Sequence, residues 1–220
     1  MTRNIAFAPG EYYHIYNRGV DKRNIFELKN DYQRFLALLH TCNIREIFRF
    51  SKDFFADPDA VFSTPKPDPL IEICSYCLMP NHFHLIVRVK EDGDLSLFMQ
   101  KLMTAYTMYF NKRNDRSGAL FQGTFKAKHT DRDEYLKYLI AYVHLNPVKL
   151  IEPTWKETGI KEKRRAQEYL DEYRYSSYKD FQGFERPQGV IIAKGSLPEY
   201  FDAPTSFKDH INNWLEFKNI

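Results

Sequence analysis

The chain has 220 residues, of which 43% are hydrophobic and 16% aromatic, and its formal net charge is +3. This composition is typical of a globular protein that buries its own core, and it excludes a low-complexity or disordered chain. The apolar runs are shorter than the roughly 18 residues of a membrane-spanning helix, and the N-terminal residues lack the apolar run of a signal peptide. We therefore expect a cytoplasmic protein that does not enter a membrane.

Hydrophobic periodicity predicts alternating strands and helices. In chain order we expect a strand over residues 11–16, a helix over 31–48, strands over 70–78 and 82–90, a helix over 95–111, a strand over 120–128, and a later helix that carries Tyr142. This βαββαβ order with an added helix is the split βαβ arrangement of ferredoxin-like folds. The expected fold class is α+β, with two helices on one face of an antiparallel sheet.

Two segments lie outside that arrangement. Residues 51–69 read as an insertion, because their prolines favour a loop or a small excursion over a regular element. From about residue 190 no catalytic motif stands out, and the apolar residues of 206–217 predict a closing helix. We accordingly expect a main domain over residues 1–180 that contains the insertion, and a C-terminal extension over 181–220.

Two histidines, His82 and His84, stand two positions apart within an apolar run. In a strand, residues i and i+2 point to the same face, so both imidazoles would face one side while Phe83 and Leu85 face the packed side. Pro80 ends the preceding strand where a β-hairpin would cross over. Two imidazoles with open positions beside them suit a divalent ion that acts on a phosphate. The alternative is a pair of solvated or hydrogen-bonded histidines.

The later helix has two candidate N-caps, Thr130 and Asp131, because an acidic residue stands three positions after each. Tyr138, Tyr142 and Asn146 are spaced by four, so they share one helical face. The proline that follows disfavours the helical region for the residue before it, so we expect Asn146 just past the last turn. On the alternative interpretation, the two tyrosines are ordinary residues at the rim of the core.

Together these motifs resemble those of the single-tyrosine HUH transposases, specifically the REP-associated tyrosine transposases. The matching segments occur in the family's order and extend from about residue 12 to 178. They are Tyr13-His14-Ile15-Tyr16-Asn17-Arg18-Gly19, Cys77-Leu78-Met79-Pro80-Asn81-His82-Phe83-His84, Ser117-Gly118-Ala119-Leu120-Phe121-Gln122-Gly123-Thr124-Phe125-Lys126, Tyr142-Val143-His144-Leu145-Asn146-Pro147-Val148 and Tyr175-Ser176-Ser177-Tyr178.

This resemblance implies a role for each residue at a matching position. It makes His82 and His84 ligands of Mg²⁺ or Mn²⁺, Asn146 a third ligand, and Tyr142 the nucleophile. The implied reaction cleaves single-stranded DNA, at hairpin sequences, through a covalent 5′-phosphotyrosine that leaves a free 3′-hydroxyl. In related transposases a partner subunit can supply the tyrosine helix, so the resemblance leaves both a monomer and a homodimer open.

Clusters of basic residues are candidate contacts to single-stranded DNA, because cations bind phosphates and nearby rings stack on bases. The alternative is a solvated surface with aromatic residues in the core, and a net charge of +3 does not by itself indicate nucleic acid. The candidates are Arg18, Lys22, Arg23, Lys112, Arg113, Arg116, Lys126 and Lys128.

Two other classes of function stay open on the sequence. A DNA-binding protein could keep the fold and lose the chemistry, but such a protein needs none of the four residues at the implied site. A metal phosphoesterase would use water in place of Tyr142 and would leave no protein attached to DNA. A zinc site is not indicated, because Cys74 and Cys77 would point to opposite faces of a strand and no second such pair exists.

Overall fold

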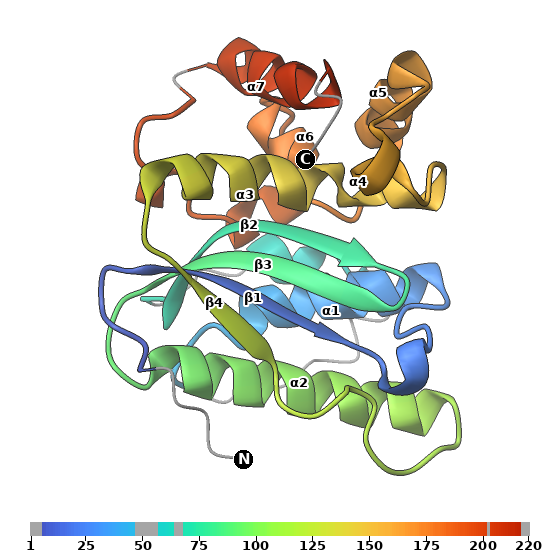
Figure 1. The fold of residues 1–220 in the computed structure, drawn as a ribbon. Coiled ribbons are helices and arrows are strands. Elements are labelled where there is room, and N and C mark those ends of the chain that lie inside the picture. The colour runs from blue at the N-terminus through green and yellow to red at the C-terminus, as the bar shows by residue number, and fades with distance from the viewer. Residues whose placement is uncertain (1–5, 47–56, 64–67, 202, 217–220) are drawn as a thin grey trace.

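The computed structural model describes residues 6–46, 57–63, 68–201 and 203–216. At its centre is an antiparallel sheet with the strand order β2-β3-β1-β4 (Figure 1). The strands are β1 (Tyr12–Arg18), β2 (Ile71–Met79), β3 (His82–Val89) and β4 (Lys126–Thr130). β2 and β3 form the predicted hairpin, and β1 lies between β3 and β4, so side chains of the central strands β3 and β1 meet on each face.

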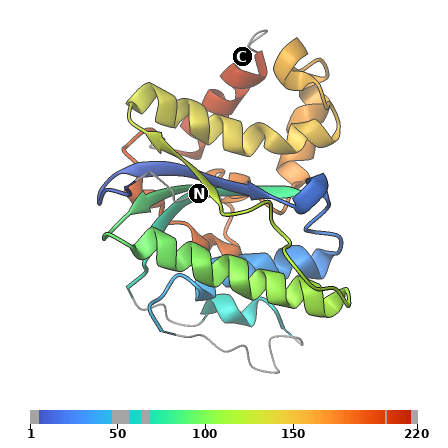
Figure 2. The same cartoon turned by 60° about the horizontal axis from the view of Figure 1, so that its bottom comes forward.

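Helices cover both faces of the sheet, and Figure 2 shows the same layers from another side. α1 (Lys29–Thr41) and α2 (Asp94–Arg113) lie on one face, where Phe83 of β3 contacts Phe35 of α1 with ring centroids 5.1 Å apart. α3 (Asp133–Leu145) lies on the opposite face. The order β1-α1-β2-β3-α2-β4 followed by α3 confirms the predicted α+β arrangement. The contact of Phe83 with α1 also confirms that Phe83 faces the packed side of the sheet.

α1 ends at Thr41, earlier than the predicted end at residue 48, and residues 47 and 48 lie outside the described part of the chain. The cause is Asn43, whose side-chain amide donates to the Ile71 carbonyl at 2.8 Å and accepts from the Ile71 amide at 2.9 Å. This paired interaction holds the chain after α1 against the first residue of β2. Further helical turns would carry it away from the sheet edge.

Part of the predicted insertion at 51–69 is described. Its 3₁₀ helix η3 (Ala60–Ser63) buries Val61 and Phe62 against α1 and against η5 (Pro187–Ile191). This part of the segment is therefore attached to the core through apolar side chains. Residues 51–56 and 64–67 lie outside the described residues.

β4 begins later than predicted, at Lys126 instead of residue 120, and it continues to Thr130. Phe121 makes only an isolated bridge with Gly19 at the end of β1. Gly123 then adopts a left-handed backbone with φ 69°, a conformation that glycine tolerates and that interrupts a strand. The extension to Thr130 also moves the start of the next helix.

α3 begins at Asp133, so its N-cap is Arg132 and neither predicted capping residue holds that position. Thr130 is unavailable because it is the last residue of β4. At the other end, Asn146 follows α3 as predicted, but it keeps helical dihedrals of φ −53° and ψ −37°. The expectation that proline would push Asn146 out of the helical region is wrong. The chain continues directly as the 3₁₀ helix η4 (Asn146–Leu150), and a first turn tolerates proline.

His144 fixes α3 to the chain segment beside β2. Its Nδ1 donates to the Ile140 carbonyl at 2.9 Å, and its Nε2 accepts from the Ser177 hydroxyl at 2.8 Å. Ser177 Oγ also accepts from the Tyr76 amide of β2 at 3.0 Å. His144 is fully buried, and burial lowers its pKa to about 3, so the imidazole is neutral in this bonding pattern.

Part of the chain after η4 packs on the outer side of α3, where α7 lies (Figure 1), whereas η5 packs against α1. The helical elements after η4 include α4 (Trp155–Thr158), α5 (Lys163–Glu172), α6 (Tyr178–Phe181), η6 (Lys194–Ser196) and α7 (Pro204–Glu216). α7 confirms the predicted closing helix, and its Trp214 contacts Tyr138 of α3 with ring centroids 5.1 Å apart. α3 is thus enclosed between the sheet and the C-terminal segment. Within the described ranges, every helix is too short or too polar to span a membrane.

Candidate active site

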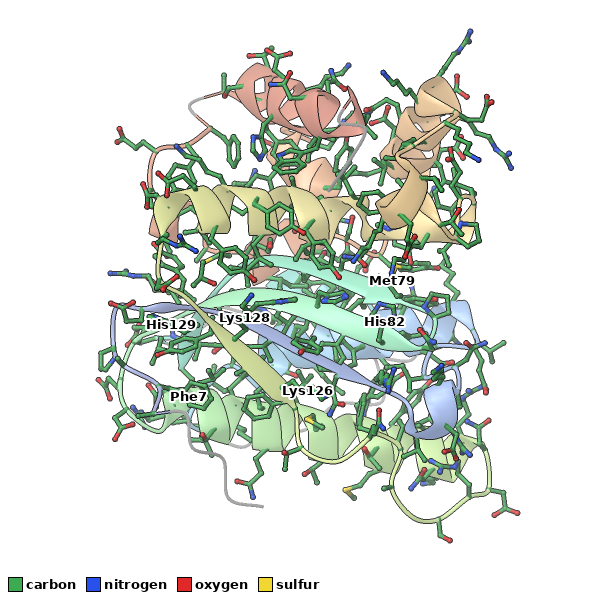
Figure 3. All side chains as sticks on the ribbon, in the orientation of Figure 1. Phe7, Met79, His82, Lys126, Lys128 and His129 are labelled. Carbon is green, nitrogen blue, oxygen red and sulfur yellow. The ribbon has the colours of Figure 1, made fainter. Side chains whose placement is uncertain are left out.

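A cavity of about 340 Å³ lies between the sheet and the C-terminal end of α3. Its lining residues are Tyr16, Asn17, Arg18, Lys22, Asn81, His82, His84, Gln122, Lys126, Tyr142, Asn146 and Lys149. All four residues that the sequence suggested for the chemistry therefore line one cavity. Figure 3 shows His82 beside Met79 at the hairpin end of the sheet. A larger hollow of about 860 Å³ lies between α1 and α2, and no histidine lines it.

His82 presents a defined nitrogen to this cavity. Asn81 donates its side-chain amide to the Lys22 carbonyl at 3.2 Å, which leaves its Oδ1 to accept from Nδ1 of His82 at 2.6 Å. With the proton on Nδ1, the lone pair of His82 resides on Nε2. Burial, reinforced by Lys149 and other nearby cations, lowers the pKa of His82 to about 4, so the ring is neutral.

His84 is paired with a third histidine, His14 of β1, which sequence reasoning missed. The His14 Nε2 and His84 Nδ1 atoms lie 2.8 Å apart, and the rings stack with centroids 5.0 Å apart. Burial is the main cause that lowers the pKa of His14 to about 4 and the pKa of His84 well below its usual value. Two neutral imidazoles share this bond, and when His84 donates, its Nε2 keeps a lone pair on the cavity side.

Tyr142 meets these histidines from α3. Its ring lies edge-on to His84, with centroids 5.6 Å apart and an interplanar angle of 83°. Burial raises the pKa of the Tyr142 hydroxyl, whereas the charge of Lys149 and a hydrogen bond with Asn146 lower it. The net result is a raised pKa for this half-buried hydroxyl, and the charge of Lys149 offsets part of the effect of burial.

Tyr138 occupies a different environment one turn earlier. Its ring stacks between Tyr135 and Tyr142, with centroids 5.9 and 6.0 Å away, and contacts Trp214 of α7. It does not line the cavity that holds the histidines. Its position is therefore that of a packing residue between α3 and α7.

The side chains present fit a divalent ion. Asn146 donates Nδ2 to the Tyr142 carbonyl at 2.7 Å, which leaves its Oδ1 free to act as a ligand. Asn146 Oδ1 and His84 Nε2 are both buried and lack a hydrogen-bond partner among the described residues. A buried acceptor without a partner is costly unless something else binds it. No group of three or more His, Cys, Asp or Glu side chains in the described ranges could hold a metal ion by itself, so a site here would have to combine the two imidazoles with the amide oxygen.

The predicted DNA contacts fall into two groups. Arg18, Lys22 and Lys126 line the cavity, and Lys128 lies nearby on β4, as Figure 3 shows. The residues at the end of α2 lie on the far side of the sheet. There Arg113 forms ion pairs with Glu27 at 2.7 Å and with Asp31 at 3.1 Å, and Arg116 binds the side chain of Asn111 and the Ala119 carbonyl. Lys112 lines the hollow between α1 and α2, and Arg23 is exposed at the end of η1 (Val20–Lys22).

Two lysines near Tyr142 were also missed by sequence reasoning. Lys149 of η4 lines the cavity, and Lys156 of α4 places its Nζ 3.7 Å from the centre of the Tyr142 ring. Lys149 follows Asn146 by one 3₁₀ turn, so the spacing after the helix was a usable signal. No sequence pattern indicated Lys156, because its contact with Tyr142 depends on how the chain turns between η4 and α4.

Comparison with known proteins identifies the family of the chain. The family model described as "Transposase IS200 like" matches residues 11–146, which include all four strands, α1, α2 and α3. Among solved structures, a REP-associated tyrosine transposase bound to a REP hairpin is similar at 13% sequence identity and a TM-score of 0.48. The alignment covers 91% of this chain and 96% of that one. No curated protein matches. Because the family match spans more than half of the chain and ends at Asn146 of the site, the chain belongs to the IS200-like transposase family.

Proposed function

We propose that this transposase cleaves and rejoins single-stranded DNA through a covalent bond between Tyr142 and a 5′-phosphate, at hairpin sequences, as the motifs of REP-associated tyrosine transposases imply. The observation that carries the proposal is the placement of Tyr142 edge-on to His84 in a cavity also lined by His82 and Asn146. A protein that only binds DNA has no need for this grouping.

The proposed cleavage is a single displacement at phosphorus. Tyr142 Oη forms a bond to the phosphorus while the bond from phosphorus to the 3′-oxygen breaks. The electron pair leaves on that oxygen, which takes up a proton and becomes a free 3′-hydroxyl, and the proton lost by the phenol balances it. Rejoining runs the same step backwards, with a 3′-hydroxyl as the attacking group. The phosphodiester energy is kept in the protein linkage, so no ATP is required.

Each residue around Tyr142 has a separate role in the proposed reaction. Lys149 favours the phenolate, because its charge lowers the pKa that burial raises. Asn146 holds the last turn of α3 by donating to the Tyr142 carbonyl. Mg²⁺ or Mn²⁺ held by His82, His84 and Asn146 would polarise a phosphate oxygen and offset its developing charge. Asn81 and His14 bind the Nδ1 atoms of His82 and His84, which would leave the Nε2 atoms for the ion.

The test is covalent trapping. The protein is incubated with labelled single-stranded hairpin DNA from the flanks of its own gene, with and without Mg²⁺ or Mn²⁺, and a denaturant-resistant adduct is sought. We expect an adduct with metal in the unmodified protein and in Tyr138→Phe. We expect none in Tyr142→Phe, which keeps the ring but lacks the nucleophile.

The same assay separates the alternatives. Binding without cleavage in the unmodified protein would identify a DNA-binding protein that has lost the chemistry. Cleavage without any adduct would indicate a metal phosphoesterase that uses water. An adduct that persists in Tyr142→Phe and disappears in Tyr138→Phe would place the nucleophile one helical turn earlier.

A further inference from the structure

Lys149 and Lys156 form an uncompensated pair of cations beside Tyr142. Their side chains interact with each other, and both are half-buried. Neither forms an ion pair with any described acidic residue, in contrast to Lys90, which pairs with Asp68. Two like charges held together in a partly buried place repel each other, so this arrangement costs free energy unless an anion joins it.

Among the described residues, the cavity beside these lysines has no carboxylate that could neutralise their charges. The lining of the cavity contains four cationic side chains and no aspartate or glutamate. Glu157 is the one acid whose charge acts on both lysines, and it makes no ion pair with either of them. Burial lowers the pKa of Lys149 and lowers the pKa of Lys156 to about 8, which reflects the cost of keeping these charges without a counterion. A bound anion would remove that cost.

The two lysines are not equivalent. Lys149 lines the cavity, and its charge acts on the Tyr142 hydroxyl. Lys156 lies over the face of the Tyr142 ring, with Nζ 3.7 Å from the ring centre, which is a cation–π contact. Both charges also act on the ring of His82. They belong to η4 and α4, whereas the cations Arg18 and Lys126 belong to strands β1 and β4 of the sheet.

We propose that Lys149 and Lys156 form a subsite for one DNA phosphate, the phosphodiester group that Tyr142 attacks. The proposal rests on the proposed function and identifies the residues that hold the reacting group. Lys149 contacts the phosphate, and Lys156 fixes the Tyr142 ring and supplies the second charge. After transfer, the phosphate carried on the tyrosine oxygen stays next to the same two cations.

The experiment measures binding without chemistry. All proteins carry Tyr142→Phe, EDTA removes divalent ions, and the probe is a fluorescein-labelled oligothymidylate of about 20 nucleotides, enough to span a single-strand site. Fluorescence anisotropy gives the binding constant at several NaCl concentrations. Each lysine that releases a counterion contributes roughly 0.7 to the slope of log K against log salt for single strands. Methionine replaces lysine, because it keeps most of the apolar stem and removes the charge.

We expect Lys149→Met and Lys156→Met each to lower the slope by about 0.7, and the double variant by about 1.4. Lys149→Arg and Lys156→Arg should keep the slope, which separates charge from packing. Lys29→Met is the matched control. Lys29 is exposed at the start of α1 on the other face of the sheet, and its loss should change nothing.

Unchanged slopes in both methionine variants would overturn the subsite, and so would a fall of the same size in Lys29→Met. Failure of the probe to bind the Tyr142→Phe protein at about 50 mM salt would overturn it as well. These results are independent of covalent trapping. A lower slope without any adduct would support the phosphate subsite and contradict the proposed covalent intermediate. An adduct with unchanged slopes would support the covalent intermediate and contradict the subsite.

Discussion

His14 offers the sharpest test of how the histidine pair is oriented. His14 is 7% exposed, and its Nε2 lies 2.8 Å from Nδ1 of His84. A ligand that coordinates through Nε2 must carry its proton on Nδ1, and the neutral ring of His14 is the group that accepts it. His14→Leu removes this acceptor and leaves a buried N–H group without a partner.

The expected loss follows from that unsatisfied donor. A buried donor without a partner costs about 1–3 kcal/mol. Loss of such a partner behind a metal ligand typically weakens metal affinity roughly 10- to 100-fold, which lies within that range of free energy. Calorimetric titration of the protein with Mn²⁺ measures this directly, without DNA. His14→Gln, which can offer an amide oxygen near the same position, should lose less affinity than His14→Leu.

His129→Gln is the matched control, since His129 is an exposed histidine of β4 that pairs with Glu11, away from His84. It should bind Mn²⁺ as the unmodified protein does. Equal Mn²⁺ affinity in His14→Leu and in the unmodified protein would refute the argument that His14 orients His84. Equal losses in His14→Leu and His129→Gln would show a general destabilisation instead.

The other predictions concern the metal ligands and the C-terminal segment. His82→Ala and His84→Ala should each abolish adduct formation while hairpin binding by gel shift persists, and cleavage at the normal rate in both would contradict the metal site. Asn146→Ala should slow cleavage less, because water can replace a neutral amide ligand; a complete loss would assign it a larger role. EDTA should stop cleavage and Mn²⁺ should restore it, and EDTA-resistant cleavage would exclude a required divalent ion. Arg186 forms an ion pair with Asp180, which is 1% exposed. Arg186→Met leaves that buried carboxylate without its counterion, so it should lower the free energy of unfolding in urea by about 3–5 kcal/mol; a change below about 1 kcal/mol would contradict this.

The order of elements was predictable because each strand and helix has its own hydrophobic period. The period of two puts His82 and His84 on one face, and the spacing of four puts Tyr142 and Asn146 on one face, and both relations are local in sequence. The structure places all four around one cavity. Their roles as ligands and nucleophile stay predictions that the trapping assay tests.

The remaining features depend on contacts between distant residues. His14 pairs with a residue 70 positions later, so no pattern near it indicates its partner. Lys156 reaches Tyr142 only after the chain has turned back over α3. The end of α1 is set by the bonds of Asn43 to β2, which helix periodicity does not contain. Propensity sets the elements, whereas tertiary contacts set their ends and bring the third histidine and the lysine pair into place.

The enclosure of α3 has a consequence for whether two copies of the chain could exchange the helix that carries Tyr142. Besides Ala141, the helix buries five larger apolar side chains at 2% exposure or less, which are Leu136, Leu139, Ile140, Val143 and Leu145. Exposing them would cost roughly 7–15 kcal/mol, comparable with the whole stability of about 5–15 kcal/mol of a typical domain. Exchange of this helix between folded copies would bury the same surface again, so the obstacle is a kinetic barrier that approaches complete unfolding. This packing therefore favours a site in which Tyr142 and the two histidines come from the same chain.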